Sequence, residues 1–242
     1  MQYSNKYIYI MILCLSIFVS VVLSLAFTTF NPFYEDNIEL DRMKNILSIT
    51  GRDISNMDKN KITDTYENFK EIVIDKDGEI IDSILYSDLF QGDELPSGES
   101  IYLFKEERVF PLFLDIDNDI LIIPVSGRGL WGTLYGYFAI NRNGTVAGIT
   151  FYKHKETPGL GGEVDAEWFK SQFNSSKNIF NTSGELLSIS IKKPGIVTSD
   201  DKYAVNGISG ATITSNGLDS FLRSDLYNYE KYIRSFSGII YD

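Results

Sequence analysis

The chain has 242 residues, of which 43% are hydrophobic and 23% charged, so a disordered or fibrous class is excluded. The formal net charge of -11 leaves no basic surface for phosphate backbones, and nucleic acid is not an expected partner. Cys14 is the single cysteine and His154 the single histidine, so neither an internal disulfide nor a thiolate cluster for a metal is expected. Any redox chemistry must therefore use an organic cofactor.

The first predicted element is a membrane anchor. No charged residue occurs from Tyr7 to Tyr34, and the apolar centre, residues 8–27, is about as long as a helix that crosses the hydrocarbon core. The run is long for a signal peptide, and no small-x-small cleavage site follows Ala26, so the anchor is expected to stay uncleaved. Lys6 precedes the apolar run and acidic residues within 35–41 follow it, which by the positive-inside rule predicts a cytoplasmic N-terminus. The soluble region then lies on the periplasmic side of a bacterial cytoplasmic (inner) membrane, as a single-pass protein.

Three segments are expected along the chain. Residues 1–34 are the anchor and its flank, residues 35–100 a linker helix and the N-terminal part of the soluble region, and residues 101–242 the main domain. Near-helical spacing of apolar residues predicts the linker helix over residues 39–49, with Gly51 ending it.

Two hairpins are predicted in the soluble region. The first spans residues 72–81, where apolar runs flank Asp77 and Gly78. The second joins strands over residues 133–140 and 145–152, with Gly144 in the turn. Both ends of this second hairpin carry glycine-rich turns, which are expected to share a site.

The rest of the domain alternates short helices and strands. Residues 164–173 predict a helix capped by Asp165, with Trp168 and the other aromatic side chains buried on one face. A strand is expected over residues 187–191 and a C-terminal helix over residues 218–233. No βαβ alternation is present, so the predicted class is α+β, with a mainly antiparallel sheet and flanking helices.

Residues 208–217 have the features of an anion-binding site. Gly210 and Ala211 permit close approach to the backbone, four hydroxyl side chains occur within seven residues, and a helix N-terminus follows. On spacing alone, a capped helix start with a glycine turn is the more usual interpretation. Spacing also leaves Thr212 and Thr214 as alternative acceptors of a modification.

The hexapeptide Ser209-Gly-Ala-Thr-Ile-Thr214 matches Ser-Gly-Ala-Thr-x-Thr, the flavinylation sequence of the FMN-binding domain family. Three other segments, residues 42–47, 127–131 and 156–162, are similar to segments of the family of C subunits of sodium-translocating NADH:quinone reductases and follow one another in the same order. Asn206 stands where the family pattern has Asp. Trp131, beside a glycine-rich turn, has two interpretations: it shields the flavin or docks a partner, or it is a buried packing residue, and buried packing is the expected one.

The resemblance implies that residues 101–242 form an FMN-binding domain and that Thr214 carries FMN through a phosphoester bond. A separate, magnesium-dependent flavin transferase would cleave FAD and attach the FMN, so Thr214 is an acceptor and no general base is expected in this chain. No catalytic or metal-ligating residue is expected. The expected FMN contacts besides Thr214 are Ser209, Gly210, Ala211, Thr212, Glu156, Thr157, Leu160 and Gly161.

By resemblance, the chain is an electron-transfer subunit of a complex that oxidises NADH, reduces quinone and exports sodium, with other membrane subunits as partners. One alternative is the G subunit of an Rnf-type ferredoxin:NAD complex, which shares the attachment motif and the single anchor. A second alternative is a membrane-anchored binding or assembly module without redox chemistry. A hydrolase using Ser209 or Ser215 is disfavoured because His154 is the only imidazole.

Overall fold

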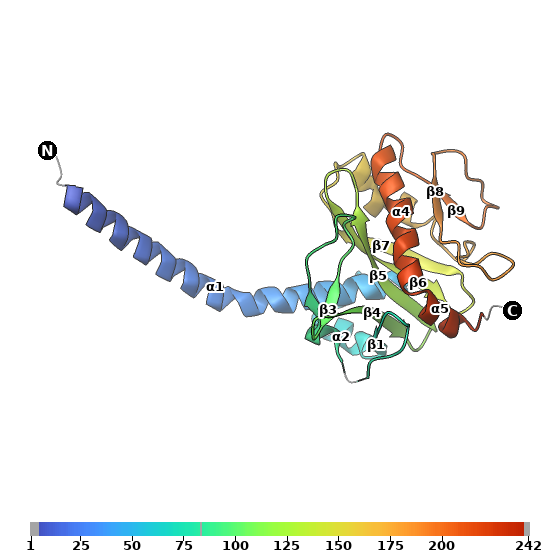
Figure 1. Ribbon diagram of the computed structural model, residues 1–242, viewed down its shortest axis with the longest axis horizontal. Coiled ribbons are helices and arrows are strands. Elements are labelled where there is room, and N and C mark those ends of the chain that lie inside the picture. Colours follow the sequence, from blue (N-terminus) through green and yellow to red (C-terminus); the bar gives the residue numbers. More distant parts are fainter. Residues whose placement is uncertain (1–4, 83, 240–242) are drawn as a thin grey trace. The chain divides into compact units, whose positions relative to one another are not determined.

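A computed structural model describes residues 5–82 and 84–239 of the chain (Figure 1). The chain divides into two compact units, Met1–Met43 and Lys44–Asp242. Helix α1 runs without interruption from Asn5 to Ile49, so the predicted linker helix is the last part of α1 and not a separate element. The helix ends as predicted, because Gly51 follows it with a φ of +79°. Within the described residues, α1 is the one helix long and apolar enough to cross a membrane, judged by length and composition.

An antiparallel sheet organises the second unit. Among the described residues it contains seven strands in the order β2-β3-β4-β5-β6-β7, with β1 also paired to β4. The strands are β1 (Phe69–Ile74), β2 (Phe90–Gln91), β3 (Tyr102–Phe104), β4 (Glu107–Asp115), β5 (Ile120–Arg128), β6 (Thr133–Asn141) and β7 (Val146–Lys153). A separate parallel pair is formed by β8 (Ser190–Lys192) and β9 (Ala204–Asn206).

Helices flank this sheet, as Figure 1 shows for α4 beside β5 and β6. They are α2 (Lys59–Tyr66), α3 (Glu167–Lys170), α4 (Thr212–Asn228) and α5 (Glu230–Ser237), with short 3₁₀ helices η1 (Tyr86–Asp88) and η2 (Gly161–Asp165). The predicted α+β class, an N-terminal apolar helix followed by a mainly antiparallel sheet with flanking helices, is confirmed.

Both predicted hairpins are present, but they differ in extent. The β6–β7 hairpin is regular and antiparallel, and Gly144 has the positive φ, +78°, that its turn requires. In the first hairpin Gly78 also has a positive φ, but the strand after the turn is reduced to one isolated bridge between Ile74 and Ile80.

The predicted helix over residues 164–173 is wrong in part. The segment is broken into η2 and the four-residue α3, and the residue at the α3 N-cap position is Ala166 rather than Asp165. This break turns Trp168 outward, where it is 48% exposed and its indole N–H donates to Glu163. Phe169 remains buried, as predicted. The predicted strand 187–191 is also shorter and later, because β8 begins at Ser190.

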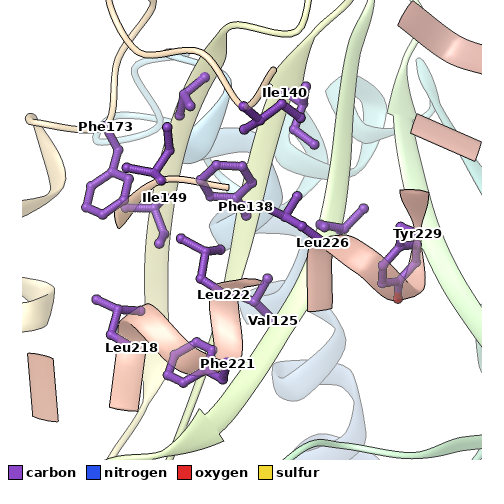
Figure 2. Packing of buried hydrophobic residues seen from close by; sticks show 14 of the residues in the cluster. Val125, Phe138, Ile140, Ile149, Phe173, Leu218, Phe221, Leu222, Leu226 and Tyr229 are labelled. Atoms are coloured by element: carbon purple, nitrogen blue, oxygen red, sulfur yellow. The ribbon is translucent and has the colours of Figure 1, made fainter. Parts of the chain in front are cut away.

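Helix α4 covers the core face of the sheet with a row of apolar side chains spaced three and four residues apart (Figure 2). The labelled members of this row are Leu218, Phe221, Leu222 and Leu226. Its backbone lies very close to β5, because a Cβ added at Gly217 would lie 2.1 Å from the carbonyl oxygen of Arg128. The helix starts at Thr212, earlier than the sequence predicted, so the flavinylation motif includes its first turn.

Candidate functional site

Three glycine-containing segments meet at one end of the sheet. Strand β6 lies between β5 and β7 and is antiparallel to both. The start of β6 and the ends of β5 and β7 therefore lie at the same end of the strands, called here the edge of the sheet. The turn of residues 127–132 and the loop of residues 156–162 are therefore neighbours. Residues 209–214 reach the same edge because α4 contacts β5.

A buried hydrogen bond joins the motif threonine to the second of these loops. The Thr214 hydroxyl donates to Oε2 of Glu156 at 2.6 Å, and the two residues are 1% and 5% exposed. Oε1 of Glu156 accepts the backbone N–H of Trp131 at 2.8 Å. One buried carboxylate therefore connects α4, the 156–162 loop and the 127–132 turn.

Two glycines lie so close to this carboxylate that a side chain at either glycine position would displace it. A Cβ at Gly161 would lie 2.4 Å from Glu156 Oε2 and 2.7 Å from Thr214 Oγ1. A Cβ at Gly129 would lie 2.6 Å from Glu156 Oε1. Sequence reasoning placed Glu156 among the cofactor contacts, but the glycine spacing alone gave no sign of its bond to Thr214.

The other hydroxyls of the motif have different surroundings. Ser209 and Thr212 are exposed, and in the described part of the chain neither hydroxyl has a hydrogen-bond partner. Ser215 is buried, and its hydroxyl oxygen accepts the backbone N–H of Ile208. The residue at the α4 N-cap position is Ala211, which has no side-chain capping bond. The interpretation of this segment as a simple hydroxyl-capped helix start is therefore wrong.

The remaining predicted contacts lie at the surface of the same edge. Leu160 is 44% exposed, and its side chain lies over Gly210, which has a φ of +77°. Thr157 is exposed, and its carbonyl oxygen accepts the backbone N–H groups of Leu160 and Gly162. These bonds fold the loop back on itself and hold its tip as a compact turn.

Further apolar side chains are exposed in these segments. Trp131 is 65% exposed, so the prediction that it is buried packing is wrong. Leu130 and Ile213 are also exposed, and sequence reasoning did not assign them to the site. The sequence signal that could have identified them is their position: Leu130 lies in the glycine-rich turn, and Ile213 is the variable residue of the motif. Exposed apolar side chains next to a polar helix N-terminus suit a ligand with an apolar ring and an anionic end.

Asn206 occupies a structural position in β9. Its side-chain oxygen accepts the backbone N–H of Val197, and its side-chain NH₂ donates to the Val197 carbonyl oxygen. Its backbone N–H and carbonyl are bonded to the side chain of Gln172. An aspartate could not donate to Val197, so the asparagine is matched to its surroundings here.

Known proteins resemble this chain in sequence. The family model described as FMN-binding domain matches residues 129–225, which include Glu156 and Thr214. The C subunit of the Na(+)-translocating NADH-quinone reductase of Pseudomonas aeruginosa is 34% identical over 221 residues, 84% of each chain. The corresponding protein of Haemophilus ducreyi is 30% identical over 225 residues, 86% of this chain and 84% of the relative.

A solved structure resembles this chain as well. The crystal structure of the C subunit from Parabacteroides distasonis superposes with a TM-score of 0.67 and 29% identity, over 83% of this chain and 95% of that chain. The relatives are subunits of an oxidoreductase complex. Identity at this level over most of both chains, with the antiparallel fold and the FMN-binding domain match, shows that the chain belongs to the family of C subunits of the Na(+)-translocating NADH-quinone reductase.

Proposed function

We propose that this chain carries FMN as a phosphoester on Thr214 and serves as an electron-transfer subunit of a sodium-translocating NADH:quinone reductase. The observation that carries the proposal is the hydrogen bond of the Thr214 hydroxyl. This hydroxyl lies in the first turn of α4 and donates to the buried Glu156 of the 156–162 loop, another segment that resembles the family. A hydroxyl placed only for helix capping would bond to a backbone amide of its own helix.

The residues at this edge fit the two ends of FMN. The exposed hydroxyls of Ser209 and Thr212 and the first amides of α4 are donors for a phosphate, and Gly210 leaves its backbone open. Leu160 and Trp131 offer exposed apolar surface to a ring system. FMN, when bound, supplies reversible electron transfer, and this chain's residues hold and orient it.

The proposal extends to location and partners. The length and composition of α1 support a single-pass anchor, which we place in the bacterial cytoplasmic membrane. Lys6 before the apolar run and the acidic residues after it are the basis for proposing a cytoplasmic N-terminus and a soluble domain on the periplasmic side. The partners are the other membrane subunits of the complex and, during maturation, a flavin transferase that uses FAD. We keep the division into an anchor (1–34), a linker region (35–100) and an FMN-binding domain (101–242) as part of the proposal.

The test is expression of the full chain with an active flavin transferase, followed by a denaturing gel imaged for flavin fluorescence. Thr214→Val keeps the buried volume and removes the hydroxyl, so the fluorescent band should disappear. Thr214→Ser keeps a hydroxyl and should retain the band. Thr212→Val removes a proposed phosphate contact but not the proposed acceptor, so a fluorescent band should remain. The matched control is Ser220→Ala, which removes an exposed hydroxyl of α4 outside the motif and should leave the band unchanged. A band that survives Thr214→Val and is lost with Thr212→Val would move the attachment to Thr212.

A further inference from the structure

We propose that Glu156 is the general base of its own chain's flavinylation, taking the proton from the Thr214 hydroxyl when that oxygen bonds to the FMN phosphorus. The inference rests on the proposed function and adds a role that the family resemblance did not imply, since no base was expected in this chain. It assigns the chemistry of activation to the acceptor and not to the transferase alone.

The geometry is that of a base and its nucleophile. The distance of 2.6 Å between Thr214 Oγ1 and Glu156 Oε2 is within the range for direct proton transfer. Both groups are shielded from water, and in the described residues no other side chain is hydrogen-bonded to this hydroxyl. A threonine hydroxyl is a weak nucleophile without an adjacent base.

The hydrogen bonds that position Glu156, apart from the bond to Thr214, come from residues outside the loop tip of residues 157–162. Its Oε1 is fixed by the Trp131 N–H, and its own N–H donates to Nδ1 of His154 at 3.3 Å. Because Thr214 is 1% exposed, attachment requires residues 157–162 to move away from the helix start. Gly159 sits at the exposed tip with a φ of +76° and no atom within 4 Å of where its Cβ would be. The proposed attachment therefore needs this compact tip to open as a unit, while the Trp131 N–H holds Oε1 of Glu156 from outside the tip.

The proposed step balances as follows. Thr214 Oγ1 forms a bond to the phosphorus that carries the riboflavin group of the flavin dinucleotide, and the bond from that phosphorus to the bridging oxygen breaks. The electron pair of the broken bond leaves on the phosphate of AMP, and the Oγ1 proton goes to Glu156 Oε2. No oxidant or reductant is consumed.

The same proton transfer removes a charge conflict in the product. Once Oγ1 is esterified, it has no hydrogen to donate, and an ionised Glu156 would face a phosphodiester anion with little water between them. A protonated Glu156 is neutral and can donate to an oxygen of the ester. A side chain at position 129 or 161 would displace this carboxyl group, so glycine at both positions leaves room for it there.

The experiment measures FMN attachment to the purified full chain in detergent, with flavin transferase, FAD and Mg²⁺, as a function of acceptor concentration. Glu156→Gln keeps the shape and an oxygen for the Trp131 N–H but accepts no proton. Its kcat should fall by about 100-fold or more, the usual contribution of a general base, while the KM for the acceptor chain stays unchanged. Glu156→Asp retains a carboxylate at a longer distance and should give an intermediate kcat. The control is Glu163→Gln, whose carboxylate bonds to Trp168 and not to Thr214.

The outcomes separate this inference from the proposed function. If the unaltered chain receives no FMN on Thr214, the proposed function fails. If the unaltered chain is modified and Glu156→Gln, shown to be folded by its melting curve, keeps the unaltered kcat, the inference alone is overturned. A rise in KM without a change in kcat would assign Glu156 to docking of the transferase and would also overturn it.

Discussion

Gly217 sets how closely α4 approaches the sheet, and alanine at this position should force the two apart. The added Cβ would lie 2.1 Å from the Arg128 carbonyl oxygen, whereas ordinary contacts begin at 3.4 Å, so about 1.3 Å (3.4 minus 2.1) must be recovered by moving backbone. Overpacking of this kind costs about 1–3 kcal/mol, here near the upper end because the contact is backbone. Replacing glycine by alanine in a helix returns about 1 kcal/mol. The expected net loss is about 2 kcal/mol, or about 4–8 °C in melting temperature for a domain of this size.

Thermal unfolding followed by circular dichroism measures this loss, and the gel fluorescence assay measures its functional effect. Movement of α4 carries Thr214 away from Glu156, so FMN attachment should slow as well. Asn216→Ala is the matched control, because the neighbouring side chain is exposed and the same residue is introduced. A Gly217→Ala chain that melts at or above the unaltered temperature would refute the close-packing argument.

Two further substitutions test a close contact of the site and a buried carboxyl group further along α4. Gly161→Ala places a Cβ 2.4 Å from Glu156 Oε2 and 2.7 Å from Thr214 Oγ1, so it should break their bond and lower the free energy of unfolding by about 1–3 kcal/mol; an unchanged urea midpoint would contradict this. Burial raises the pKa of the Asp225 carboxyl well above its ordinary value of 3.8, so the folded state keeps a proton that the unfolded state releases. Stability is then full below about pH 3.8 and is lost as the pH rises toward the folded pKa, by about 1.4 kcal/mol per unit. Asp225→Asn, which still accepts the Ser126 N–H, should melt higher than the unaltered chain at pH 8, with a gap that narrows toward pH 4; a gap independent of pH would refute the assignment.

The elements that were predicted correctly from the sequence are determined by residues close together in the chain. The hairpin around Gly144 and the end of α1 before Gly51 depend on turn chemistry and on the period of apolar residues within a few positions. The class of the fold followed from the absence of βαβ alternation. These features require no knowledge of distant contacts.

The failures have non-local causes. Trp168 fitted an apolar helix face, but the segment is broken by η2 and the indole finds a partner in Glu163 instead of the core. Trp131 followed the usual rule for a large aromatic residue, yet its turn lies at the open edge of the sheet. The bond between Thr214 and Glu156 joins residues 58 positions apart, so no local pattern could reveal it.

The central claim is that Thr214 is the residue that carries FMN. The most direct measurement is tandem mass spectrometry of the tryptic peptide from Tyr203 to Arg223, taken from the chain produced with an active flavin transferase. The peptide is predicted to gain the mass of FMN less one water, with fragment ions that place the addition on Thr214. An unmodified peptide, or an addition placed on Thr212, Ser209 or Ser215, would contradict the claim.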